Sequence, residues 1–175
     1  MNENKSTYEH LSLIINRYDH YLDVINTKGT FLISIYTFLI TITLYNINEI
    51  LRIENCSIFT MMSILLILGL ILLFFGIFFV LKAVFPWLKF ENDTQKKSLI
   101  FFGSVSQYSN EDYISKMSTN SKEDNIKDLS DQVHVLSNAL TKKYKLISKS
   151  MNILYLIGII VITLLVLLAV NEVIK

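Results

Sequence analysis

Few side chains in this sequence are of the histidine and cysteine types that bind metals through nitrogen or sulfur. The chain has three histidines, His10, His20 and His134, and a single cysteine, Cys56. Their spacing matches no metal-binding motif, and His20 with Asp23 would supply only two ligands on one helical face. A single cysteine also leaves no partner for a disulfide within the chain. We therefore expect no metal site.

Motifs for phosphate binding and for nucleophilic catalysis are also missing from the sequence. It contains no glycine-rich phosphate loop, no hydrolase-type serine flanked by glycines, and only two arginines. Charged residues make up 18% of the chain and hydrophobic residues 52%, whereas soluble domains carry about 25% charged residues. We therefore predict a protein that is not an enzyme, with no catalytic residue and no cofactor.

Three uncharged apolar stretches account for this composition, and they must position every other residue. They cover residues 29–48, 57–81 and 150–171, with lengths of 20, 25 and 22 residues. About 20 apolar residues in a helix cross the hydrocarbon core of a bilayer. We therefore predict an all-α membrane protein with three transmembrane helices, of which the second extends to about residue 85.

Lys and Arg are distributed unevenly between the segments outside these spans. The N-terminal arm and the insert between the second and third spans hold fourteen of them, whereas the first hairpin and the C-terminal tail hold two. The cytoplasmic segments of membrane proteins carry the excess of basic residues. We therefore predict that the N-terminus and the insert are cytoplasmic and that the C-terminus is outside.

This topology predicts four parts of the chain. They are a cytosolic amphipathic helix (1–28), a transmembrane hairpin (29–86), a cytosolic insert with a short and a long helix (87–149), and the third transmembrane helix (150–172). Pro86 and Trp87 close the hairpin, because proline disfavours helix in the residue before it and tryptophan prefers the headgroup boundary. The apolar run at 98–105 fits a short strand, a buried turn or an interfacial segment.

Two polar segments carry apolar residues at alternating spacings of three and four, the pattern of coiled-coil helices. We call these two rows of side chains the seams. One seam is Tyr8, Leu11, Ile15, Tyr18, Leu22 and Ile25, and the other is Ile126, Leu129, Val133, Leu136 and Leu140. We predict that the seams pair in a cytosolic helical stalk, within one chain or between chains, and that the protein forms a homo-oligomer.

Serine and threonine side chains mark the expected starts of the helices in the polar segments. Ser6 or Thr7 is expected to cap the N-terminal helix. Ser109 and Ser121 are each followed three residues later by an aspartate, which is typical of a capping arrangement. We therefore expect a short helix from Ser109 to about Met117, and a long helix that runs from Ser121 into the third span.

The first two spans carry small residues at helical spacing. We call Thr30, Ser34, Thr37, Thr41 and Asn48 the polar stripe of the first span. It fits close packing between membrane helices, or a wettable face that lines a pore after assembly. Gly69 and Gly76, two turns apart on the second span, are expected to let another helix approach closely.

Several short motifs occur in a fixed order along the chain. An amphipathic helix ends in Ile25-Asn26-Thr27-Lys28 at the first span, and Pro86-Trp87 follows the second span. The insert carries Ser98-Leu99-Ile100-Phe101-Phe102-Gly103, then Tyr113, Asp131-Gln132, Leu136-Ser137 and Lys143-Tyr144. In their order and spacing these motifs resemble the bacterial Pycsar transmembrane effector family over most of the chain. The usual Asp-x-Lys-Ala at the first span is here Asn26-Thr27-Lys28-Gly29.

The resemblance implies a small membrane effector of a bacterial antiphage, abortive-infection system, located in the inner membrane. A partner cyclase would supply cyclic CMP or cyclic UMP, and the effector would respond by impairing membrane integrity. A membrane-anchored helical scaffold and a holin-like pore former without a nucleotide ligand are the alternatives. The mildly positive insert suits the anionic inner leaflet of the bilayer and is far from a nucleic-acid-binding surface.

The implied ligand requires groups that bind its phosphate, and no motif identifies them. Candidates are the backbone amides around Gly103 and the helix N-termini near Ser109 and Ser121. Lys96 and Lys97 lie nearby in the sequence. The sequence leaves the nucleotide-binding residues unassigned.

The predicted topology can be checked by labelling cysteines in intact cells. Cys56 lies in the first hairpin, so it should react with a membrane-impermeant maleimide added from outside. A cysteine introduced by Asn120→Cys lies in the insert and should react only after lysis. Labelling of position 120 in intact cells would overturn the topology.

Overall fold

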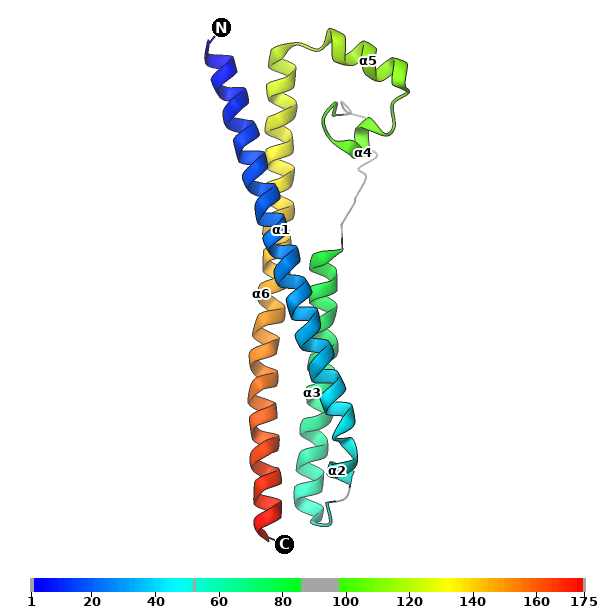
Figure 1. Ribbon diagram of the computed structural model, residues 1–175, viewed down its shortest axis with the longest axis vertical. Coiled ribbons are helices and arrows are strands. Elements are labelled where there is room, and N and C mark those ends of the chain that lie inside the picture. The colour runs from blue at the N-terminus through cyan, green and yellow to red at the C-terminus, as the bar shows by residue number, and fades with distance from the viewer. Residues whose placement is uncertain (1, 52, 86–97, 175) are drawn as a thin grey trace. The chain divides into compact units, whose positions relative to one another are not determined.

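The computed structural model describes residues 2–51, 53–85 and 98–174, so Pro86, Trp87, Lys96 and Lys97 lie outside the described residues. The described residues form six helices and contain no strand (Figure 1). These are α1 (Asn2–Tyr45), α2 (Ile47–Leu51), α3 (Cys56–Val84), α4 (Phe102–Val105), α5 (Asn110–Thr119) and α6 (Lys122–Ile174). Three of them, α1, α3 and α6, are long and apolar enough to cross a membrane. The predicted all-α class, with three helices able to span a membrane, is therefore confirmed for the described residues.

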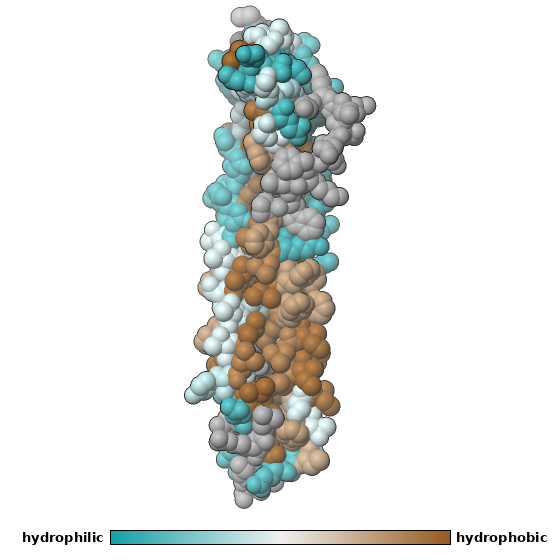
Figure 2. All heavy atoms as spheres, turned by 90° about the vertical axis from the view of Figure 1, so that its right-hand side faces the viewer, coloured by the Kyte–Doolittle hydropathy of each residue, from teal (hydrophilic) through white to brown (hydrophobic). Residues whose placement is uncertain are grey.

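The chain divides into two compact units, and both α1 and α6 contribute to each of them. The polar unit comprises the described residues of Met1–Val24 and Pro86–Thr141, and the membrane unit comprises those of Ile25–Phe85 and Lys142–Lys175. Hydropathy separates the two units, because apolar side chains gather over the helices of the membrane unit and hydrophilic ones over the polar unit (Figure 2).

Helix α1 joins the N-terminal arm and most of the first span in one unbroken helix of 44 residues. It begins at Asn2, so the expected cap at Ser6 or Thr7 is wrong. No glycine or proline precedes Ser6, and nothing in that segment stops a helix from extending to the start of the chain. The helix ends at Tyr45, where Asn46 donates from its backbone amide and from Nδ2 to the Ile42 carbonyl, at 3.2 and 2.8 Å.

Helix α3 corresponds to the second predicted span and is capped at both ends. Asn55 Oδ1 accepts hydrogen bonds from the amides of Ser57 and Ile58, each at 3.2 Å. At the other end Phe85 is the C-cap, and its amide donates to the Leu81 carbonyl at 2.9 Å. These caps satisfy backbone groups that a helix leaves unpaired at its ends.

A buried polar contact joins α1, α3 and α6 within the membrane unit. Tyr36 Oη donates to the Ser150 carbonyl at 2.7 Å. Ser150 Oγ lies 3.0 Å from Tyr36 Oη and 3.1 Å from the Gly76 carbonyl, and its one proton can go to either. Tyr36 and Ser150 are each 0% exposed. We call Tyr36, Gly76 and Ser150 the three-helix junction.

The sequence predicts that Gly69 and Gly76 let another helix approach closely. A Cβ at Gly76 would overlap the ring of Tyr36, whereas a Cβ at Gly69 would lie 3.7 Å from Ile160 on α6, which is an ordinary van der Waals contact. Both glycines are buried, but the prediction is confirmed for Gly76 alone. Gly29 on α1 acts in the same way, because a Cβ there would overlap Val84 of α3.

Apolar packing completes the membrane unit where α2 meets α3 and α6. Ile50, Ile53 and Met62 form a buried cluster, and partly buried side chains of α3 and α6 surround it. Many other large apolar side chains of the spanning helices are exposed, such as Phe74 at 64% and Ile162 at 64%. Contiguous exposed apolar surface is rare on soluble proteins and is expected where helices contact lipid.

The two seams are covered over most of their length. On α6 Leu129 is buried, and the other four seam residues from Ile126 to Leu140 are partly buried. On α1 Leu11, Ile15, Tyr18 and Leu22 are partly buried, whereas Tyr8 is 49% exposed. Pairing of the seams and their assembly into a stalk stay a prediction.

The junction predicts different effects for alanine at two glycines of the membrane unit. Gly76→Ala places a Cβ against the buried Tyr36 ring and should destabilise the protein by about 1–3 kcal/mol, the usual effect of overpacking. Gly158→Ala should leave the stability nearly unchanged, since nothing lies within 4 Å of its Cβ. Thermal unfolding of the purified protein in mild detergent measures both, and equal melting temperatures would contradict the proposed close approach.

Candidate functional site

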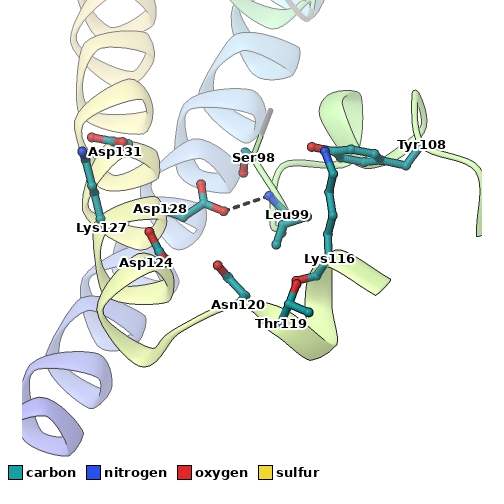
Figure 3. Close-up of a pocket in the computed structure, with 10 residues that line it drawn as sticks. All are labelled: Ser98, Leu99, Tyr108, Lys116, Thr119, Asn120, Asp124, Lys127, Asp128 and Asp131. Carbon is teal, nitrogen blue, oxygen red and sulfur yellow. Dashed lines mark hydrogen bonds between the residues drawn. The ribbon is translucent and has the colours of Figure 1, made fainter. Parts of the chain in front are cut away.

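A pocket of about 320 Å³ lies in the polar unit, between α5, α6 and the segment that precedes α4 (Figure 3). Its size falls in the range of ligand sites. The lining residues are Ser98, Leu99, Tyr108, Lys116, Thr119, Asn120, Asp124, Lys127, Asp128 and Asp131. Three aspartates and two lysines among them make the pocket strongly polar, with carboxylates in excess.

Helix α6 supplies one wall of the pocket. Asp124, Lys127, Asp128 and Asp131 follow the i, i+3, i+4, i+7 pattern, so they lie on one helical face. The start of this helix is fixed by Ser121, as the sequence predicted. Ser121 Oγ accepts from the Asp124 amide at 3.0 Å and donates to Asp124 Oδ2 at 2.7 Å.

The segment at Ser98 and Leu99 is fastened to the helices around the pocket. Asp128 Oδ2 accepts from the Leu99 amide at 2.9 Å, and the Tyr113 hydroxyl donates to the Leu99 carbonyl at 3.1 Å. Gln132 Nε2 of α6 donates to Ser98 Oγ at 3.3 Å. Asp128 therefore serves the fold, because it holds the lining segment against α6.

These contacts decide the structure of the ambiguous run at 98–105. Ser98 Oγ accepts from the amides of Ile100 and Phe101, at 3.1 and 2.9 Å. The short helix α4 follows directly, with the amides of Ser104 and Val105 both donating to the Phe101 carbonyl at 2.9 Å. The run is a turn followed by one helical turn, so the strand interpretation is wrong.

Helix α5 and the turn after it form the opposite side of the pocket. Ser109 caps α5 as predicted, because its Oγ accepts from the Asp112 amide at 3.1 Å. Lys116 Nζ lies 4.7 Å from the centroid of the Tyr108 ring, which is a cation–π contact. Asn120 Nδ2 donates to Asn125 Oδ1 at 2.8 Å and holds the turn between α5 and α6.

Several of the backbone groups proposed from the sequence as phosphate donors are already engaged or lie beside carboxylates. At the starts of α5 and α6, a serine and an aspartate occupy each cap, and further acidic residues, Glu111 and Glu123, lie in the first turn. The carboxylates already compensate the positive helix ends. Around Gly103, the amides of Ile100, Phe101, Ser104 and Val105 donate within the chain. These contacts and carboxylates make the helix starts less favourable for a phosphate than the sequence suggested.

The sequence's few potential metal ligands are not brought together. His10, His20, His134 and Cys56 are all exposed. Among the described residues, no three His, Cys, Asp or Glu side chains are arranged to hold a metal ion.

The polar stripe of the first span lies on the exposed side of α1. Thr30, Ser34, Thr37 and Thr41 each donate a hydroxyl proton to a carbonyl four residues earlier, at 2.9–3.2 Å. Their hydrogen-bonding needs are thus met within the helix. The stripe does not pack inside the chain, so the packing interpretation requires a second chain.

A contact of Lys143 could not be found from the sequence. Lys143 precedes the third predicted span, and its Nζ donates to the carbonyls of Ala83 and Val84 at 2.7 and 3.3 Å. These carbonyls belong to the last turn of α3, whose partial negative charge attracts a cation. Burial lowers the pKa of the Lys143 ammonium group.

Comparison with known proteins identifies the family of this chain. No curated protein and no solved structure matches it. The family model of the Pycsar effector protein domain matches residues 10–171, a range that includes all three predicted spans and the pocket. The resemblance seen in the order of short motifs is confirmed by this match. The chain belongs to the Pycsar effector protein domain family.

Proposed function

We propose that this protein is the membrane effector of a bacterial antiphage system, activated by cyclic CMP or cyclic UMP to impair the inner membrane. The observation that carries the proposal is the family match over residues 10–171, together with three helices able to cross a membrane. A partner cyclase would release the nucleotide upon infection. The effector's task in this scheme is binding and rearrangement, and it needs no catalytic residue.

We place the polar unit in the cytoplasm, where the product of a cyclase accumulates. The excess of Lys and Arg in the N-terminal arm and the insert supports this orientation. The first hairpin and the C-terminus then lie outside. In the division that we propose, residues 1–28 and 87–149 are cytosolic, and 29–86 and 150–172 form the membrane part.

Helix α6 is the element that we propose to carry the signal. It runs without interruption from Lys122 to Ile174, so one helix includes a pocket wall, a seam and the third span. Within the membrane unit, Ser150 of α6 contacts Tyr36 and Gly76. Hydrogen bonds between membrane helices contribute about 0.6–1.7 kcal/mol each, so a displaced α6 could break this junction at modest cost.

We propose that the active form is a homo-oligomer. Three helices of one chain are too few to enclose an aqueous pore with lipid outside. The polar stripe of α1 is exposed and its hydroxyls are bonded within the helix. In an assembly these stripes can meet at contacts between chains, or face a common aqueous path.

The proposed function can be tested in vesicles of bacterial phospholipids that contain the full chain. A potential-sensitive dye reports whether the membrane holds an imposed potential. Cyclic CMP or cyclic UMP should collapse the potential, whereas linear 5′-CMP should not.

Other outcomes of this experiment identify the alternatives. Collapse without any nucleotide would indicate a holin-like pore former. A potential that survives both cyclic nucleotides would contradict the effector mechanism, and a stable partner protein captured with the chain would then favour a scaffold.

The role of the α6 seam is tested by Leu136→Asp. This change places a charge on a partly buried apolar row, where an unpaired charge is strongly unfavourable. The spans are unchanged, so membrane insertion should be normal, while the nucleotide response and phage protection are lost. Asn138→Asp is the matched control, because Asn138 is exposed two residues away. Full activity of Leu136→Asp at normal membrane levels would exclude the seam as the transmitting element.

A further inference from the structure

The pocket of the polar unit contains charged groups that the fold does not use. Asp128, Asn120 and Ser98 hold the pocket together through the hydrogen bonds described above. In the part of the chain that the structure describes, by contrast, no hydrogen bond or ion pair engages Lys127 or Asp131. The lining residues are thus of two kinds: some hold the pocket together, and Lys127 and Asp131 are available to a ligand.

Lys116 is a cation held in a defined position at this pocket. Its ammonium group lies over the Tyr108 ring, and Tyr108 in turn lies beside Tyr113, with 6.4 Å between the ring centroids. Figure 3 shows Lys116 extending from α5 along the side of the pocket that faces α6. An anion that reaches Lys116 from within the pocket would therefore have the carboxylates of α6 on its other side.

From this arrangement we infer that the pocket between α5 and α6 is the binding site for the activating cyclic nucleotide. The phosphate would contact Lys116, with Lys127 contributing a second positive charge, and the N–H and O–H donors of base and ribose would contact Asp131. The inference rests on the proposed function, since the ligand class comes from it.

The charge of the pocket suits a cyclic monophosphate better than linear nucleotides. Such a cyclic ester carries one negative charge, the smallest charge of any nucleotide monophosphate, and so meets the least repulsion from carboxylates that outnumber the two lysines. Each additional negative charge, as in 5′-CMP or CTP, would be repelled by Asp124, Asp128 and Asp131. The three carboxylates therefore select against the abundant linear nucleotides of the cell.

The same carboxylates favour cytosine over uracil. The amino group of cytosine offers N–H donors to a carboxylate, which is a common pairing in base recognition. The corresponding edge of uracil places a carbonyl oxygen on each side of its single N–H, and these oxygens are repelled by carboxylates. Cyclic CMP is therefore expected to bind more tightly than cyclic UMP.

Equilibrium dialysis of the purified full chain against radiolabelled cyclic CMP and cyclic UMP tests the site. Lys116→Gln and Asp131→Asn should each weaken binding of cyclic CMP at least tenfold, the usual effect of losing a hydrogen bond to a charged group. Lys142→Gln and Glu123→Gln are the matched controls, because both residues are exposed on α6 and do not line the pocket. Unchanged melting temperatures would show that the variants are folded.

The outcomes distinguish a failure of the proposed binding site from a failure of the proposed function. If the wild-type chain binds a cyclic nucleotide and the two pocket variants bind it equally well, the site is wrong while the proposed function stands. If the wild-type chain binds neither nucleotide, the proposed activation fails and the site fails with it. Equal competition by 5′-CMP would overturn the charge argument, and tighter binding of cyclic UMP would overturn the preference for cytosine.

Discussion

Hydrocarbon offers a polypeptide no hydrogen-bond partner, and this constraint shapes the whole membrane unit. Every backbone group within the bilayer must be satisfied by the protein itself, which favours helices. Polar side chains obey the same rule here. The hydroxyls of the α1 stripe donate to carbonyls of their own helix, whereas Ser150 and Tyr36 satisfy one another across helices. The three-helix junction thus satisfies polar side chains between helices, whereas the stripe satisfies its hydroxyls within one helix.

Features that depend on neighbours in the sequence could be predicted from it. The length of the apolar runs defines the spans, and the absence of glycine and proline allows α6 to continue from the insert into the third span. Serine followed by aspartate marks the starts of α5 and α6, since both halves of each cap lie within one helical turn. Gly76 could be identified as an approach point, although the residue that it faces could not.

Contacts between distant residues could not be predicted in this way. Tyr36 and Ser150 are 114 residues apart, and Lys143 lies about 60 residues from the carbonyls that it contacts. In the sequence Asp128 is indistinguishable from a solvated surface charge, whereas in the structure it accepts a hydrogen bond from the Leu99 amide. The phosphate donors inferred from helix ends are an inference that local contacts weaken. A cap motif predicts where a helix starts, and it also means that a carboxylate already occupies that start.

The junction also has a consequence for how this sequence can change over time. Ser150 has one proton for two acceptors, and Gly76 leaves room for one ring and no more. A change at any of the three positions alters what the other two must do, so their energetic effects are not additive. A larger residue at position 76 would require a smaller side chain at position 36, and the Ser150 carbonyl would then lose the hydroxyl that donates to it. Substitutions at the three positions are therefore expected to be coupled, although the positions lie on three different helices.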